Sequence, residues 1–544
     1  MKKIIYFFII SFSTTASAQT WDWAFQGGGS GDDFGQGITT DLHGDVYLVA
    51  DYMGNAYYSS TYLTGLYFAN ILIAKHDSVG NVLWVQKANG ANSKGISIDS
   101  LGNCYITGSC GSNAIFYGTS NSITVTSQDG NAFIAKYDAS GNVLWVQLHG
   151  YVISNDCGNA IKTDAVGNSY ITGQSYYQDG TGQERYNYFL SKYDTQGNLL
   201  WTKNSNWRGG VNPTGLDIDE NGNCYITGTF RDSAFFDNTI LISNWNKRNT
   251  VFMAKYDKNG NVIWARKDGT NYSEAQGISL DKKENFYITG RYMAPSTFGS
   301  TQLTGTNPGA SMFIAKYDTS GNNIWAKNAS TGTWGRGVNR DTSGNCFVTG
   351  WMGNTATFGE GINTVTLISA KANREIFAAK YDKNGNLTWA VSPGGSTGES
   401  NQVMAIHSDE KNNCYITGGF SDSTIFGYTT LYAPKATHGY FDIFIAKLKD
   451  NNGITPIGII ATESNSSLNI YPNPTAGIFQ INYSSAEKNK LQLNIIDSKG
   501  KTIFTETFQG DYNKVIDLGR KAKGIYLIEI VSDKKRVTKR VVLN

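Results

Sequence analysis

The chain has 544 residues, with 61 Gly, only 8 Pro, and a high aromatic content of 32 Tyr, 26 Phe and 12 Trp. This mixture suits many short strands joined by tight turns, and it argues against both a mainly helical protein and a disordered one. The formal net charge is only +2, so no global electrostatic field attracts nucleic acid, and no nucleic-acid partner is predicted.

The N-terminus reads as a secretory signal peptide, residues 1–18. Lys2 and Lys3 precede an apolar run at 4–12, and Ala16-Ser17-Ala18 is a small-x-small cleavage site that would leave Gln19 first. A buried N-terminal strand is the alternative interpretation. No other stretch approaches the ~20 apolar residues of a spanning helix, so no transmembrane segment is predicted.

One template recurs seven times along the chain. Its first half reads GISIDSLGNCYITG at 95–108, and its second half reads FIAKYDASGNVLWVQ at 133–147. The copies follow at intervals of about 55 to 68 residues, which is too regular for chance. The other first halves begin at Gly37, Ala160, Gly215, Gly277, Gly337 and Met404, and the lysine of the second half recurs at Lys75, Lys192, Lys255, Lys316, Lys380 and Lys447.

Each copy predicts four antiparallel strands, here named A to D in chain order. In the second copy these are 96–99, 104–107, 133–137 and 143–146, which are rich in β-formers and alternate in polarity. A Gly in each short polar loop supplies the positive φ of a tight hairpin. Four strands per repeat are typical of a propeller blade. We therefore expect an all-β protein with a seven-bladed β-propeller over 19–450.

The last copy is predicted to lack its own strand D. The tryptophan that marks this strand occurs only six times for seven copies. The segment 21–25, Trp-Asp-Trp-Ala-Phe, precedes the first strand A as strand D precedes each later one. It is expected to complete the last blade and to remove two exposed sheet edges. The six tryptophans are Trp84, Trp145, Trp201, Trp264, Trp325 and Trp389.

The template resembles the bacterial beta-propeller repeat family, whose units read roughly GNxYVTG followed by a FVAKYDxxGxxxW half. The resemblance covers about residues 21–450 and implies an architecture. The family has no common catalytic residues to carry over to this chain.

After a linker at 451–467, residues 468–544 predict a small β-sandwich. This stretch resembles the type A sorting domain of type IX secretion, found in Bacteroidetes. The resemblance rests on YPNPTAGIF at 471–479, DSKGKTIF at 497–504, GIYLIEI at 524–530 and the basic end KRVV at 539–542. It implies that the type IX secretion machinery is a partner, and that the chain is released or anchored at the surface. An Ig-like binding module is the alternative.

The sequence predicts no catalytic constellation, no cofactor and no metal site. The five His show no metal-ligand spacing, and no nucleophile elbow, P-loop or CxxC is present. The Asp-x-x-Gly-Asn loops are too short for a calcium loop and recur where a hairpin must turn, so we interpret them as turn chemistry. The seven repeated lysines are expected to lay their stems over apolar surface and to meet a nearby turn Asp.

Residues that differ between copies are the candidates for function. The B–C and D–A connections are long, variable and expected on one face of the propeller, where they carry aromatics absent from the template. The candidate ligand-binding residues are Trp207, Trp245, Trp334, Tyr57, Tyr58, Tyr62, Tyr176, Tyr177 and Tyr186. Alternatively, these rings cover their own loops or form a short extra hairpin over the blade.

Two cysteines lie off the template. Cys110 starts a B–C connection and Cys157 lies in the next D–A connection, so both are expected on one face in an oxidising compartment, and a disulfide between them is predicted. The other cysteines occupy one strand-B position in separate blades and are expected to be buried small hydrophobes. They are Cys104, Cys224, Cys346 and Cys414.

The sequence thus predicts a secreted or surface-displayed binding or adhesion protein whose ligand is a glycan or another surface component. The rival hypothesis is a secreted hydrolase or lyase acting on polysaccharide, which needs converging carboxylates. Nothing in the sequence brings two of them together. The off-template acids available for that role are Asp32, Asp33, Asp179, Glu184, Glu274 and Glu399.

Overall fold

The computed structural model divides the chain into two compact units, Met1–Gly458 and Ile459–Asn544. It describes residues 19–127, 130–150, 155–178, 184–205, 210–243, 249–305, 309–361, 363–369, 374–394, 400–433, 441–450, 468–471, 475, 477–483, 490–497, 501–519, 521–531 and 536–543. The predicted signal peptide and linker lie outside these residues. Over the described ranges every regular element is a β-strand, and no helix with the length and apolar character of a membrane span occurs there.

The fourth copy shows how one repeat folds. Its strands β16 (Gly210–Ile218), β17 (Cys224–Arg231), β20 (Thr250–Tyr256) and β21 (Val262–Asp268) pair antiparallel in chain order. Nearly every residue of β17 and β20 is buried, whereas β21 is partly exposed. The middle strands are therefore covered on both faces, as they must be where sheets stack face to face.

The other copies repeat this order. The A strands are β2 (Phe34–Thr40), β12 (Asn155–Thr163), β22 (Ser273–Leu280), β28 (Thr333–Arg340) and β34 (Asn401–Ser408). The B strands are β3 (Val46–Tyr52), β8 (Cys104–Tyr117), β13 (Ser169–Gln178), β23 (Phe286–Met293), β29 (Cys346–Met352) and β35 (Cys414–Phe420). The C strands are β6 (Asn70–His76), β10 (Asn131–Tyr137), β14 (Glu184–Tyr193), β26 (Ala310–Tyr317), β32 (Glu375–Tyr381) and β38 (Asp442–Lys449).

The D strands complete the sheets. One long strand, β7 (Val82–Ile98), serves as strand D of copy one and then as strand A of copy two, which joins the first two sheets. The remaining D strands are β11 (Val143–His149), β15 (Leu199–Asn204), β27 (Asn323–Asn328), β33 (Leu387–Val391) and β1 (Thr20–Gly29).

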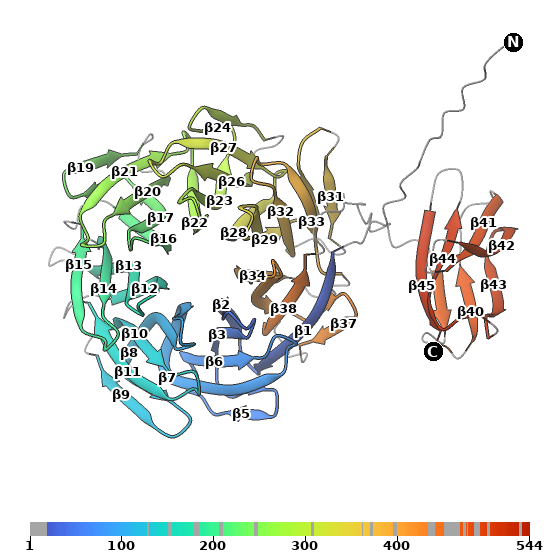
Figure 1. The fold of residues 1–544 in the computed structure, drawn as a ribbon, viewed down its shortest axis with the longest axis horizontal. Coiled ribbons are helices and arrows are strands. Elements are labelled where there is room, and N and C mark those ends of the chain that lie inside the picture. The colour runs from blue at the N-terminus through green and yellow to red at the C-terminus, as the bar shows by residue number, and fades with distance from the viewer. Residues whose placement is uncertain are drawn as a thin grey trace, which may run out of the picture. The chain divides into compact units, whose positions relative to one another are not determined.

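The sheets of the first unit stand around a common middle, with the A strands innermost and the D strands toward the rim (Figure 1). Each A strand contacts the A strand of the next copy, and β34 of the last copy contacts β2 of the first. The N-terminal strand β1 pairs antiparallel with β38, so that Trp23 lies opposite Lys447. It is thus the fourth strand of the last copy, in the place that the sequence predicted for it.

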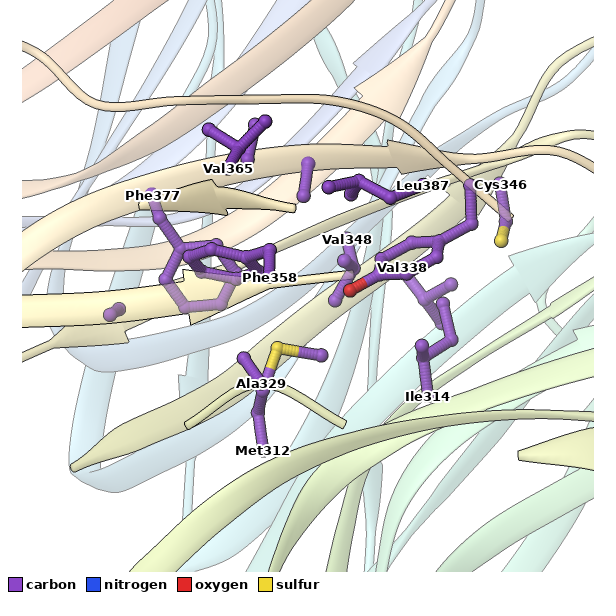
Figure 2. Packing of buried hydrophobic residues seen from close by; sticks show 14 of the residues in the cluster. Met312, Ile314, Ala329, Val338, Cys346, Val348, Phe358, Val365, Phe377 and Leu387 are labelled. Atoms are coloured by element: carbon purple, nitrogen blue, oxygen red, sulfur yellow. The ribbon is translucent and has the colours of Figure 1, made fainter. Parts of the chain in front are cut away.

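The hydrophobic core is divided into clusters that lie between neighbouring sheets. In the cluster of Figure 2, Met312 and Ile314 of β26 meet Val338 and Val348 of the next copy. Cys346 lies in the same cluster and is fully buried. Its counterparts Cys104, Cys224 and Cys414 are likewise buried free thiols, as predicted for small hydrophobes.

The repeated tryptophan and the turn glycine form a contact between copies. Trp145 Nε1 donates a hydrogen bond to the carbonyl of Thr195 at 3.2 Å, and a Cβ atom on Gly197 would lie only 2.9 Å from the indole. Gly197 also has a φ of 85°, so this turn needs glycine for its conformation and for space. The same contact joins Trp84 to Gly141, Trp201 to Gly260, Trp264 to Gly321 and Trp325 to Gly385.

The repeated lysine of strand C has a structural role. In copy three, Lys192 Nζ lies 3.9 Å from Asp164 of the A–B turn and 4.7 Å from the centre of the Tyr170 ring. This confirms the prediction of a buried stem and a turn carboxylate for six of the seven lysines, whereas Lys447 meets Asp22 of β1 at 3.6 Å. The same ion pair joins Lys75 to Asp41, Lys136 to Asp99, Lys255 to Asp219, Lys316 to Asp281 and Lys380 to Asp341.

Most B–C connections fold into a small second hairpin on the outer rim, beside strand D (Figure 1). This is the alternative that the sequence left open for their aromatics. The hairpin strands are β4 (Ala56–Tyr58), β5 (Thr61–Leu63), β9 (Ser122–Thr126, paired with β8), β18 (Ser233–Phe236), β19 (Thr239–Ile242), β24 (Ser296–Phe298), β25 (Thr301–Leu303), β30 (Thr355–Phe358), β31 (Val365–Ile368), β36 (Ser423–Phe426) and β37 (Thr429–Tyr432).

The second unit has two antiparallel sheets that share one apolar core, so its residues build a small β-sandwich. Phe479 and Ile481 come from the first sheet, and Leu493 and Ile528 from the second. In pairing order the first sheet is β39 (Leu468–Tyr471), β40 (Ile478–Tyr483) and β43 (Tyr512–Asp517), and the second is β42 (Thr502–Gln509), β41 (Lys490–Ile496), β44 (Gly524–Val531) and β45 (Arg536–Leu543).

Candidate ligand-binding site

Every innermost strand carries a β-bulge at the same place. In β28, for example, the pairing with β29 shifts between Gly335 and Gly337, so the residue between them has no partner in the ladder. All seven bulged residues line a hollow of about 190 Å³ at the centre of the first unit, and the bulge thus presents one variable side chain per copy to this channel. They are Gln36, Lys94, Asn159, Thr214, Gln276, Arg336 and Met404.

The channel has a positive lining. Lys94, Lys162 and Arg336 contribute side chains to it, and none of its described lining residues is a carboxylate. The charge of Lys162 is partly compensated, because its Nζ lies 3.3 Å from Asp217 at the end of the channel near the A–B turns. His407 stays neutral near pH 7, because burial and the charge of Lys162 lower its pKa to about 3.

An arginine–tryptophan cluster lies in copies five and six, at the strand ends that lead to the B–C and D–A connections. The guanidinium carbon of Arg291, in β23, is 3.7 Å from the centre of the Trp334 ring, in β28. This is a close cation–π contact, and the Arg336 guanidinium carbon lies 5.8 Å from the same ring. The sequence placed Trp334 in a D–A connection, and the structure places it at the second residue of strand A, beside that connection.

Glu274 holds Arg291 in this position. Its carboxylate accepts a hydrogen bond from Arg291 Nε at 2.7 Å and further hydrogen bonds from Tyr272 and Asn249. Burial alone would raise the pKa of Glu274, but Arg291 and Tyr272 outweigh it and lower that pKa. The carboxylate is therefore ionised and fully engaged, which makes it a positioning group for Arg291.

A second aromatic–guanidinium pair extends the cluster. Trp351 lies directly opposite Trp334 in the β28–β29 ladder, with ring centroids 5.2 Å apart. The guanidinium carbon of Arg374, just before β32, is 4.6 Å from the centre of the Trp351 ring. Arg291, Trp334, Trp351 and Arg374 thus form one row in which two neighbouring indoles lie between two cations, and we call it the Arg–Trp row.

The structure scatters the other predicted aromatics. Tyr58 is buried and its hydroxyl lies 2.8 Å from His76 Nε2, so it belongs to the core. Tyr57 and Tyr62 are exposed and pack together on the β4–β5 hairpin, with centroids 4.8 Å apart. The prediction that these tyrosines share one binding face with Trp334 is therefore wrong, because their hairpin turns out to the rim.

The aromatics of copy three lie on an extended β13–β14 hairpin. Tyr176 and Tyr186 are directly opposite each other, with ring centroids 5.1 Å apart. Tyr177 pairs through its backbone with Arg185, and its side chain lies outside the described residues. Trp207 and Trp245 also lie outside them. The position of these last two rings stays a prediction.

Among the off-template acids whose side chains are described, Asp32 and Asp33 lie near each other and near Asp442, whereas Glu274 belongs to another copy. Asp33 is fully buried and accepts backbone hydrogen bonds from Gly29 at 2.6 Å and Met53 at 2.9 Å. Asp32 accepts one from the backbone of Phe441 at 3.2 Å. Asp179 and Glu399 lie outside the described residues, as does the side chain of Glu184. Glu274 accepts hydrogen bonds from three donors, so it is not the free acid that a hydrolase needs.

The predicted disulfide is not formed in the structure, where Cys110 and Cys157 are both free thiols. Cys110 packs with Ala91 in the cluster between copies one and two. Cys157 faces copy two from the other side and lies beside the Ser109 hydroxyl. Because neighbouring residues of a strand point to opposite faces, the sheet that contains Ser109 and Cys110 separates the two sulfurs.

Sequence reasoning missed Arg291, Arg336, Trp351 and Arg374. A signal for Arg336 was present, because the position before the glycine or alanine in the middle of each strand A changes type from copy to copy. Its meaning was hidden, because an alternating strand pattern does not reveal which residue bulges. Arg374 and Trp351 carried no signal beyond their departure from the template.

Comparison with known proteins places the C-terminal unit in a family. Residues 469–544 match the family described as the secretion system C-terminal sorting domain. This domain marks proteins sorted by type IX secretion, so the protein is delivered to the cell surface or to the outside.

The chain also has remote relatives. An uncharacterized WD repeat-containing protein of Acanthamoeba polyphaga mimivirus is 24% identical over 454 residues, which cover 66% of this chain and 32% of that protein. An endo-acting ulvan lyase of Formosa agariphila is 27% identical over 141 residues, which cover 25% of this chain and 26% of the lyase. The chain thus spans about a third and about a quarter of these two proteins.

Among solved structures, a gluconolactonase from Xanthomonas campestris aligns with 80% of this chain and 99% of its own, at 10% identity and a TM-score of 0.29. A likeness this remote says nothing about function.

Proposed function

We propose that the first unit is a closed, seven-bladed β-propeller that binds a glycan outside the cell, and that the Arg–Trp row is its binding site. Seven four-stranded copies, the contact of β34 with β2 and the pairing of β1 with β38 support the closed ring. The sorting domain supplies delivery to the surface. The residues repeated in every copy are needed to fold it, so we assign recognition to the residues that vary between copies.

The observation that carries the proposal is the stacking of Arg291 on Trp334, continued by Trp351 and Arg374. A sugar ring has apolar C–H faces that pack on an indole, and polar rims that accept hydrogen bonds from guanidinium groups. Glu274 fixes the Arg291 guanidinium before any ligand arrives, so little entropy is lost on binding. The similarity of 141 residues to a polysaccharide lyase fits a carbohydrate ligand.

The rival proposal of a polysaccharide-acting enzyme has less support. A hydrolase needs two accessible carboxyl groups across one site. The charge of Glu274 is compensated by its ion pair with Arg291. Asp33 is buried and accepts two backbone hydrogen bonds. The accessible chemistry of the row is cationic and aromatic, which suits binding.

The test is a glycan array probed with the full secreted chain and with the Trp334→Ala variant. We expect the variant to lose at least ten-fold in affinity for the glycans that the parent binds, with a melting temperature within a few degrees. Tyr57→Ala is the control, since it removes an exposed aromatic side chain from the β4–β5 hairpin of copy one, outside the row. Equal binding by the parent and Trp334→Ala would contradict the proposed site.

A further inference from the structure

We propose that an anionic group of the ligand, a sulfate or carboxylate on the sugar, binds at the channel mouth between Arg336 and the indole N–H of Trp334. This inference rests on the proposed glycan-binding function and names the class of glycan. One buried donor without an acceptor, the Trp334 N–H, and one cation without a carboxylate partner among the described residues, Arg336, carry it.

Arg336 is a cation without a counter-ion. Its Nη1 donates to the amide oxygen of Gln276 at 3.2 Å, and its Nη2 contacts Met404 Sδ at 3.4 Å. It makes no ion pair with a carboxylate among the described residues. The nearest acid, Glu274, is already paired with Arg291. Burial and the repulsion of Arg291 lower the pKa of Arg336, which shows that the site disfavours an uncompensated positive charge.

The indole of Trp334 adds an unused donor beside this charge. Its Nε1 is buried and has no hydrogen-bond partner in the described part of the protein. Leaving a buried donor unsatisfied costs about 1–3 kcal/mol, and native proteins do so mainly where an absent partner completes the site. Both free groups are donors, so the group that completes the site must be an acceptor, and the charge of Arg336 selects an anion.

The dimensions fit an oxyanion. The Arg336 guanidinium carbon is 5.8 Å from the centre of the Trp334 ring. The guanidinium and the indole are thus neighbours, and because each donor of a charge-assisted hydrogen bond lies about 2.8 Å from its acceptor oxygen, an acidic group with two or three oxygens can reach donors on both. Behind it lies the channel of about 190 Å³ with its cationic lining, and in front lies the Arg–Trp row on which a sugar ring would pack.

The position of Arg336 also explains why the charge is buried at all. As the bulged residue of β28 it is turned out of the ladder and into the channel, where six of the seven bulged residues are polar. Lys94 occupies the same bulge position in copy two and lines the same channel. The two cations therefore differ mainly in their neighbours, since Arg336 is the one with Trp334 beside it.

The experiment measures the binding of the full chain to dextran sulfate, to polygalacturonate, to neutral dextran and to inorganic sulfate by titration calorimetry. We expect at least one of the two anionic polymers to bind at least ten-fold more tightly than neutral dextran. Sulfate ion should bind weakly at most, because it lacks the sugar that packs on the row. The preferred polymer then identifies sulfate or carboxylate as the recognised group.

Variants separate a specific site from general attraction. Arg336→Gln should weaken the preferred polymer at least ten-fold, and Trp334→Phe, which keeps the aromatic face but loses the N–H, should weaken it several-fold. Lys94→Gln removes the same charge from the same ring of bulges and should change affinity less than three-fold. Trp334→Phe also guards against misfolding of Arg336→Gln, because it leaves all charges in place.

The inference is overturned if Arg336→Gln and Lys94→Gln weaken binding equally, if neither anionic polymer binds, or if neutral dextran binds as tightly as the charged polymers. In the last case, loss of neutral-glycan binding in Trp334→Ala would leave the proposed function standing. Unchanged binding of a neutral glycan by Trp334→Ala would instead count against the proposed function itself.

Discussion

Trp23 of the N-terminal strand lies on Gly80, where an added Cβ atom would come within 2.9 Å of the indole, and its Nε1 donates to the carbonyl of Ser78 at 3.4 Å. Trp145 stands in the same relation to Gly197, at 2.9 Å, within the body of the repeats. The first strand of the chain therefore makes the contact of an ordinary strand D, although it reaches the last copy from the other end of the sequence.

This equivalence predicts the cost of removing Trp23. We expect Trp23→Ala and Trp145→Ala to destabilise the protein by similar amounts, about 2–3 kcal/mol each, somewhat below the ~3–5 kcal/mol of a fully buried aromatic. The measurement is the denaturant midpoint of each variant beside the parent. If Trp145→Ala is destabilised and Trp23→Ala melts like the parent, the ring is not held by β1.

A buried pair of carboxyl groups near β1 should make stability depend on pH. Burial, with a contribution from Asp442, raises the pKa of Asp33 to about 8, and burial raises that of Asp442 to about 7. Both exceed the ~3.9 of an exposed Asp, so between pH 4 and 8 the folded state binds more protons than the unfolded state. Stability should therefore fall as the pH rises through this range.

Asp442→Asn tests this explanation, because it removes one acid and spares the backbone hydrogen bonds that Asp33 accepts from Gly29 and Met53. We expect a shallower pH dependence and a gain of about 1–3 kcal/mol at pH 8, since one unit of pKa shift corresponds to about 1.4 kcal/mol. Melting curves from pH 4 to 9 provide the measurement. An unchanged slope would show that the pair does not titrate in the folded protein.

Lys380 should matter more for folding than its counterparts. It pairs with Asp341 at 2.8 Å and with Asp450, and the side chains of both partners are at most 2% exposed. Lys380→Met leaves two buried carboxylates uncompensated, which should cost about 3–5 kcal/mol. Lys192→Met is the matched control, because Lys192 meets only Asp164, at 3.9 Å, and we expect about 1 kcal/mol. Equal losses in urea denaturation would refute this difference.

Export predicts a processed product. The protein recovered from the cell surface or medium should begin at Gln19 and lack the residues after about 465, because the sorting domain at 469–544 is expected to be removed. Intact-mass measurement of the secreted protein checks both ends at once. A surface product with the mass of the whole chain would contradict the predicted cleavages.

Local chemistry was readable from the sequence wherever a residue acts on its own turn. Asp99 illustrates this: its Oδ1 accepts the backbone N–H groups of Leu101 and Asn103 at 3.0 and 2.9 Å, within one tight loop. Such hydrogen bonds need only a short spacing, so the Asp-x-x-Gly-Asn turns followed from the residues alone. The cysteine pair failed for the opposite reason, because the face on which Cys110 lies depends on the register of a whole strand.

The seven repeats, their four strands, the place of residues 21–25 beside the third strand of the last copy and the sorting domain were determined by the sequence itself, because periodicity, turn residues and apolar alternation act over a few neighbouring positions. Only the tertiary structure decided that Glu274, Arg291 and Trp334 meet and that Arg336 enters the channel. These residues lie in three strands, β22, β23 and β28, which belong to two neighbouring copies. Their meeting depends on how one sheet stacks on the next and on a one-residue bulge, which no local pattern encodes.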